Sequence, residues 1–185
     1  MQEVDNVLRI LKEARLAINV ADTYKMRILS DQTVHTATIY QDPDNVIVAV
    51  LVYALSKIMQ RENYRTMEGW KEFYQVLLKN LDDSIFAIEK NELEKFRTAM
   101  GKIRSSINEI ESDLRIYIQD VFRKAELNKA LKIYEHGLSA QQTAELLGVS
   151  LWDLSSYIGQ SSISEAHEQG ISVKERIKIA EEFFS

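Results

Sequence analysis

The sequence predicts an all-α protein, on three observations. The 185 residues include one proline and six glycines, whereas a sheet-rich fold needs more turn residues. Apolar residues recur at helical spacing in nearly every long segment. Several segments also start with a helix-capping pattern, in which a serine or asparagine is followed three residues later by an acid or an amide. We expect an N-terminal antiparallel bundle of long helices over residues 1–136 and a second unit over residues 137–185.

Composition narrows the class of protein further. Hydrophobic residues make up 45% of the chain, enough to bury a sizeable core. Cysteine is absent, which excludes disulfides and thiol chemistry and fits a cytoplasmic protein. The longest apolar run, residues 46–55, is far shorter than the ~20 residues of a membrane-spanning helix. The acidic first residues lack the apolar region of a secretion signal, so we expect none.

A regular apolar stripe predicts a first helix over residues 3–28, with a break near residues 19–22. Residues 29–44 show no helical stripe, so they are expected to form a loop or a short extended segment. Pro43 then opens a helix that continues to about Glu62, because the missing N–H of proline costs nothing in a first turn. This helix is apolar on nearly every side and should be central; a buried strand is the alternative.

Thr66 is expected to start the next helix, and Asn91 with Glu94 to cap the one after it. From there apolar residues alternate spacings of three and four: Leu93, Phe96, Met100, Ile103, Ile107, Ile110, Leu114, Tyr117 and Val121. This heptad seam predicts one long helix in an antiparallel bundle, with a coiled-coil dimer as the alternative. Gly137 is expected to follow the end of the last bundle helix.

Residues 139–159 have the pattern of a helix-turn-helix. Two capping patterns, Ser139 with Gln142 and Ser150 with Asp153, start successive helices. The small residue Ala144 allows the two helices to approach closely, and Gly148 provides the sharp turn between them. Val149 and Leu154 are expected to pack the second helix into the core. We expect the second helix to end at Gly159.

In DNA-reading helix-turn-helix proteins the second helix enters the major groove. The corresponding candidate partner- or DNA-binding residues are Ser150, Leu151, Trp152, Ser155, Ser156 and Gln160. Serine and glutamine can hydrogen-bond bases, whereas adjacent leucine and tryptophan are typical of a protein-interface anchor. Trp152 therefore has three interpretations: a core residue folded against the last helix, a partner-binding anchor, or a DNA contact.

Charge favours a protein partner over DNA. No lysine or arginine occurs in residues 139–159, and residues 125–185 carry a net charge of −4 out of −5 for the whole chain. A DNA reader normally neutralises several phosphates with lysine and arginine. Beyond the helix pair, Gly170 is another expected helix end. Ser172 with Glu175 caps a final amphipathic helix to Phe184 that would suit a hydrophobic groove.

Signals of an enzyme are weak. His35 falls in the irregular segment near Asp42 and Asp44, where it could bind a metal or act as an acid or base. Because no second histidine or pair of suitably spaced carboxylates accompanies it, a surface or capping role is favoured. His136 is expected at a helix end and His167 on a solvated helix face. The sequence has no phosphate-binding glycine loop and no serine-nucleophile elbow. We expect no catalytic residue, no cofactor and no metal.

The segment GLSAQQTAELLGVSLWDLSSYIG, followed by SVKERIKIAEEFF, resembles the C-terminal part of small prokaryotic, especially archaeal, helix-turn-helix proteins. The resemblance covers residues 137–184 and does not extend to residues 1–125. Some proteins of this kind are antitoxin-like partners of PIN-domain nucleases. The resemblance therefore implies a regulatory role with a protein partner.

Two functions from different classes follow. The first is a non-enzymatic interaction protein, in which the bundle dimerises or senses a signal and the helix-turn-helix binds a protein. The alternative is a transcription regulator, in which a dimeric bundle holds two helix-turn-helix units on DNA half-sites. The salt dependence of binding distinguishes the two functions, because the affinity of a protein for DNA falls steeply as the salt concentration rises. A helical enzyme that uses His35 is a distant third.

Overall fold

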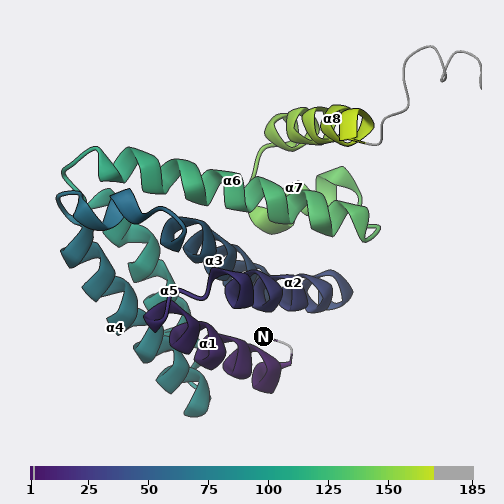
Figure 1. Ribbon diagram of the computed structural model, residues 1–185. Coiled ribbons are helices and arrows are strands. Elements are labelled where there is room, and N and C mark those ends of the chain that lie inside the picture. The colour runs from purple at the N-terminus through teal and green to yellow at the C-terminus, as the bar shows by residue number, and fades with distance from the viewer. Residues whose placement is uncertain (2, 169–185) are drawn as a thin grey trace, which may run out of the picture.

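The computed structural model describes the backbone of residues 1 and 3–168, and side chains as far as Ser161. Over these residues the chain is all-helical, as predicted, and contains no strand (Figure 1). The α-helices are α1 (Val4–Asn19), α2 (Thr23–Tyr40), α3 (Pro43–Met59), α4 (Trp70–Glu89), α5 (Leu93–Asn108), α6 (Leu114–Glu135), α7 (Ala140–Leu147) and α8 (Leu151–Glu168), and a 3-10 helix, η1 (Glu62–Thr66), precedes α4. The expected helix over residues 172–184, together with Gly170, lies outside the described residues.

The helices pack as two hairpins with covering helices. Helices α2 and α3 form a hairpin in the middle of the molecule, and α4 and α5 form a second hairpin that crosses its end (Figure 1). Helix α1 packs on α2, α3 and α4, while α6 packs on the other side of the α2–α3 hairpin. Helices α7 and α8 lie on α6, away from α1 (Figure 1). None of the described helices is long and apolar enough to cross a membrane.

Helix α3 is the central helix, as the sequence predicts. Asp42 caps it, since its Oδ1 accepts the backbone N–H of Asp44 at 2.9 Å, and Pro43 occupies the first turn. Side chains on every face of α3 are buried, which is why its sequence is almost uniformly apolar. The alternative of a buried strand is wrong. The helix also ends at Met59, a few residues earlier than expected, and η1 follows.

The loop expected over residues 29–44 is the largest error of the sequence interpretation. The break near residue 20 is confirmed, because Ala21 has a φ of 51° and Asp22 caps α2 by accepting the N–H of Lys25. Helix α2 then continues to Tyr40. Two of its threonine hydroxyls donate to carbonyls one turn back, Thr33 to Leu29 and Thr38 to Val34, each at 2.9 Å. Packing against α3 therefore overrides weak helix propensity.

The heptad seam is divided between two helices, so the expected single long helix is wrong. Helix α5 ends at Asn108 and α6 begins at Leu114. Between them Ile110 is buried, and Ser112 donates to the carbonyl of Glu68 at 2.6 Å, which holds the turn against the start of α4. Most seam residues on both helices are buried inside this one chain. A continuous coiled-coil dimer along this seam is therefore excluded.

Three expected helix boundaries also differ. Asn91 does not cap α5; it has a φ of 57°, and Glu92 occupies the N-cap position. Helix α4 begins at Trp70 and not at Thr66, after Gly69 with a φ of 83°. Gly159 lies within α8 and does not end it. By contrast, Gly137 follows α6 with a φ of 104°, as predicted.

Candidate functional site

The helix pair α7–α8 is built by the local signals that the sequence contains. The Ser139 hydroxyl accepts the N–H of Gln142 at 3.2 Å, and the Gln142 side chain accepts the N–H of Ser139, also at 3.2 Å. Gly148 ends α7 in the left-handed conformation, with a φ of 68°. Ser150 then caps α8 by accepting the N–H of Asp153 at 2.9 Å. The direction of α8 is therefore set within these few residues.

A small apolar cluster seats the pair on the bundle. Ala144 of α7 and Leu154 of α8 are buried together with Ala130 of α6, and Val149 packs against them. An ion pair between Arg123 and Asp153, 3.0 Å apart, joins α6 to the first turn of α8. Because Leu154 faces the bundle, the opposite face of α8 is left open to solvent.

All six candidate binding residues are exposed: Ser150, Leu151, Trp152, Ser155, Ser156 and Gln160. Trp152 is 80% exposed and Leu151 is 50% exposed. Trp152 is therefore not part of the core that the described residues form. The interpretation in which Trp152 packs against the last helix involves residues outside the described part of the chain and is not tested. We call these six residues the α8 surface.

The α8 surface carries no charged side chain. Arg123 of α6, which contacts the first turn of α8, is paired with Asp153. Exposed side chains on α7 add amides and one acid: Gln141, Gln142 and Glu145. Such a surface has hydrogen-bonding groups and a large aromatic side chain but offers no cation to a phosphate backbone.

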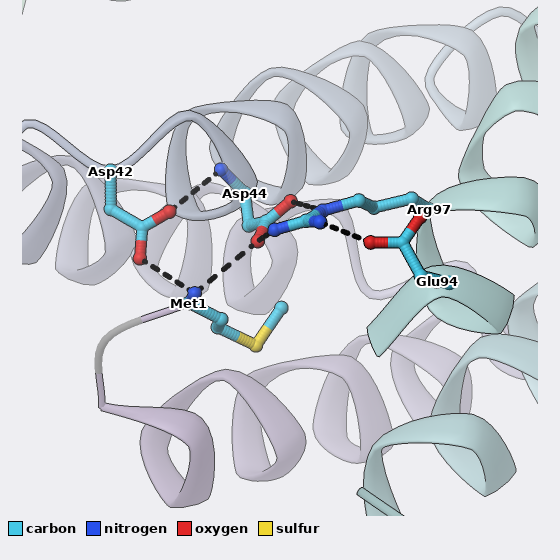
Figure 2. Close-up of polar contacts among 5 residues, drawn as sticks. All are labelled: Met1, Asp42, Asp44, Glu94 and Arg97. Carbon is cyan, nitrogen blue, oxygen red and sulfur yellow. Dashed lines mark hydrogen bonds and ion pairs between the residues drawn. The ribbon is translucent and has the colours of Figure 1, made fainter. Parts of the chain in front are cut away.

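The metal-binding or acid–base site considered at His35 does not form, and the favoured surface position agrees with the structure. His35 lies on α2, not in a loop, and is exposed. Both acids considered as its neighbours are engaged elsewhere, as Figure 2 shows. The Met1 ammonium lies 3.6 Å from Asp42 and 3.5 Å from Asp44, and Arg97 binds both oxygens of Asp44 at 3.0 Å. These contacts join the start of α3 to α5 and have a structural role.

His136 also lacks the surroundings of a reactive group. The rings of His35 and His136 lie edge to face with centroids 6.3 Å apart. The Nδ1 atom of His136, just after α6 as expected, lies 2.7 Å from the carbonyl oxygen of Lys132. The side chain of His167 lies outside the described part. Nowhere in the described residues do three or more His, Cys, Asp or Glu side chains gather into a group that could hold a metal ion.

One polar cluster that the sequence interpretation missed lies within the bundle, between α2, α3 and α6. The Lys129 side chain is fully buried, its Nζ donates to Asp31 at 2.8 Å, and it lies 4.2 Å from the centre of the Tyr53 ring. Lys132 binds the same oxygen of Asp31 at 2.6 Å. A sequence signal existed, since Lys129 lies one turn from the buried Ala125 and Ile133.

Burial changes the ionisation of this cluster. Desolvation lowers the pKa of Lys129 to about 8, although its bond to Asp31 opposes that shift. The pKa of Asp31 is lowered because bonds to Lys129 and Lys132 outweigh its own desolvation. Desolvation, with smaller contributions from Tyr157 and Asp31, raises the pKa of Tyr53. The cluster thus brings together ionisable groups from α2, α3 and α6.

Comparison with protein-family models, curated proteins and solved structures found no match for this chain. The resemblance to small helix-turn-helix proteins therefore stays a prediction.

Proposed function

We propose that this chain is a non-enzymatic, cytoplasmic interaction protein that binds a protein partner through the α8 surface, in the manner of an antitoxin. The observation that carries the proposal is the exposure of Trp152, with Leu151 beside it, on a helix without cations. Exposed tryptophans are the side chains that most often become buried anchors at protein interfaces. The serines around Trp152 are small enough to let a partner close over the ring.

A second candidate is DNA binding by the same helix. Ser150, Ser155, Ser156 and Gln160 are all exposed, and each can hydrogen-bond a base edge. The absence of lysine and arginine from residues 139–159 argues against it, because phosphate contacts supply much of the affinity of a DNA reader. We therefore rank a protein partner first.

The test is affinity capture from the native host with three forms of the full chain. These are the wild type, Trp152→Ala and the matched control Phe86→Ala, whose ring is also exposed (58%) but lies on α4. We expect a stoichiometric protein to co-purify with the wild type and with Phe86→Ala. Loss of the tryptophan should weaken its binding roughly thirtyfold, as for an interface hot spot.

A nuclease-treated parallel sample separates the two candidate functions. Recovery of DNA fragments with a common sequence, released by moderate salt, would replace protein binding with DNA binding as the main function. A protein that is captured equally by wild type and Trp152→Ala would show that the α8 surface is not the binding site.

A further inference from the structure

An apolar groove lies where the helix-turn-helix meets the bundle. Its volume is about 560 Å³, and α3, α5, α6 and α7 each contribute to its wall, with Val50, Met100, Phe122 and Leu147 as examples. A second cavity of about 590 Å³ lies beside it under the α7–α8 turn. The two share Arg104, Phe122, Glu126 and Gly148. Volumes of this size are typical of small-molecule sites.

One charged side chain in this groove is poorly compensated. Glu126, which lines both cavities, has a side chain that is only 19% exposed, and burial raises its pKa. Its ion-pair partner, Arg104, lies 2.9 Å away but is 77% exposed, so water screens the attraction. The other arginine in the wall, Arg97, is already held by Asp44 and Glu94.

We propose that the groove binds a small apolar molecule that carries one ammonium group, with Glu126 as its counter-ion. The apolar wall would cover the hydrocarbon part of the ligand. The ammonium would take the place of the solvated Arg104 guanidinium against the carboxylate, at little cost because exposed ion pairs contribute little.

The sign of the ligand charge follows from burial. A ligand carboxylate would have to pair with Arg104, which is mostly in water, and would lie near the half-buried negative charge of Glu126. A ligand ammonium would instead pair with the charge that has lost most of its water, where electrostatic attraction is stronger. No residue of the α8 surface lines the apolar groove, and only Ser150 lines the second cavity, so a ligand in the groove would leave Trp152 free for the proposed partner.

The test is calorimetric titration of the full chain with three matched probes: octylamine, octanol and octanoate. We expect octylamine to bind roughly tenfold more tightly than octanol, the ratio expected for one favourable partly buried charge pair. Octanoate should bind more weakly than octanol. The Glu126→Gln variant, which keeps the shape of the side chain, should bind octylamine no better than octanol while its affinity for octanol is unchanged.

A pair of leucine variants on α5 locates the site. Gly101 lines the groove, and a Cβ built there meets nothing within 4 Å, so Gly101→Leu should fold and block the groove to all three probes. Ser105→Leu, on the same helix but outside both cavities, should bind the probes like the wild type. The proposal is overturned if no probe binds, if octanoate binds as tightly as octylamine, or if Gly101→Leu leaves binding intact.

Discussion

At the residue scale, the ammonium of Lys129 is a charge that burial disfavours, although it pairs with Asp31. Its pKa of about 8 lies below the ordinary 10.5, so between these values the unfolded chain binds more protons than the folded one. The free energy of unfolding should therefore rise as the pH increases from 8 towards 10. Below pH 8 the folded state bears the full cost of keeping this lysine charged.

We predict that Lys129→Met raises the free energy of unfolding at neutral pH by about 1–3 kcal/mol. Methionine keeps the packing of the aliphatic chain, and Asp31 retains Lys132 as a partner. Urea unfolding near pH 7 and near pH 9 measures the effect, and the rise in stability with pH should be absent from the variant. Lys132→Met is the control, because it removes a half-exposed lysine and should not stabilise the protein. A destabilised Lys129→Met variant would contradict this account.

At the element scale, the same substitution should have opposite effects at two glycines. Gly148 ends α7 with a φ of 68°, a conformation that strains any residue with a Cβ, whereas Gly101 lies inside α5. A Cβ at either position meets nothing within 4 Å, so the effect of an alanine on stability depends on the backbone conformation alone. We predict that Gly148→Ala destabilises the protein by about 1–2 kcal/mol and that Gly101→Ala stabilises it by about 0.5–1 kcal/mol.

The urea midpoints of the two alanine variants, measured against the wild type, check this prediction. Equal shifts of the same sign would mean that the left-handed turn at Gly148 does not constrain the α7–α8 pair. A midpoint of Gly101→Ala below that of the wild type would mean that α5 is distorted at this glycine.

Some helices could be predicted from sequence patterns alone, and others could not. The α7–α8 pair was predictable because its caps and its turn glycine act within a few residues, as Ser139 and Gly148 do. Helix α2 was not, because its second half is stabilised by packing on α3 and not by its own propensity. The seam residues keep a regular spacing through the turn that contains Ile110, so periodicity alone could not locate the end of α5.

Candidate sites that depend on contacts between distant parts of the chain could not be predicted from the sequence. The six residues of the α8 surface could be named from the helix-turn-helix pattern alone, since position within one motif decides their exposure. The Lys129–Asp31 pair and the groove around Glu126 join helices that are far apart in the sequence. No spacing rule connects such residues, so only the fold could place them together.

At the scale of the whole molecule, the α7–α8 pair should open before the bundle unfolds. The bundle is held by one extensive apolar core, whereas α7 and α8 bury only Ala144 and Leu154 in their small cluster with Ala130, and Leu146 and Leu147 are only partly buried against the main core. Few buried apolar contacts give a low local opening free energy. We predict that the protected amides of α7 and of the first turns of α8 open at a free energy at least about 2 kcal/mol below that of the α3 amides.

Native-state hydrogen exchange in low concentrations of urea measures this order. Amides of α3 should show a steep urea dependence, because they exchange through global unfolding, while those of α7 and α8 should show little. Asp153→Asn, which removes the ion pair to Arg123, should speed exchange in α8 and leave α3 unchanged. If α7 and α3 opened at the same free energy, the pair would be an integral part of the bundle. A partner at the α8 surface would then meet a rigid face and not a separately docked module.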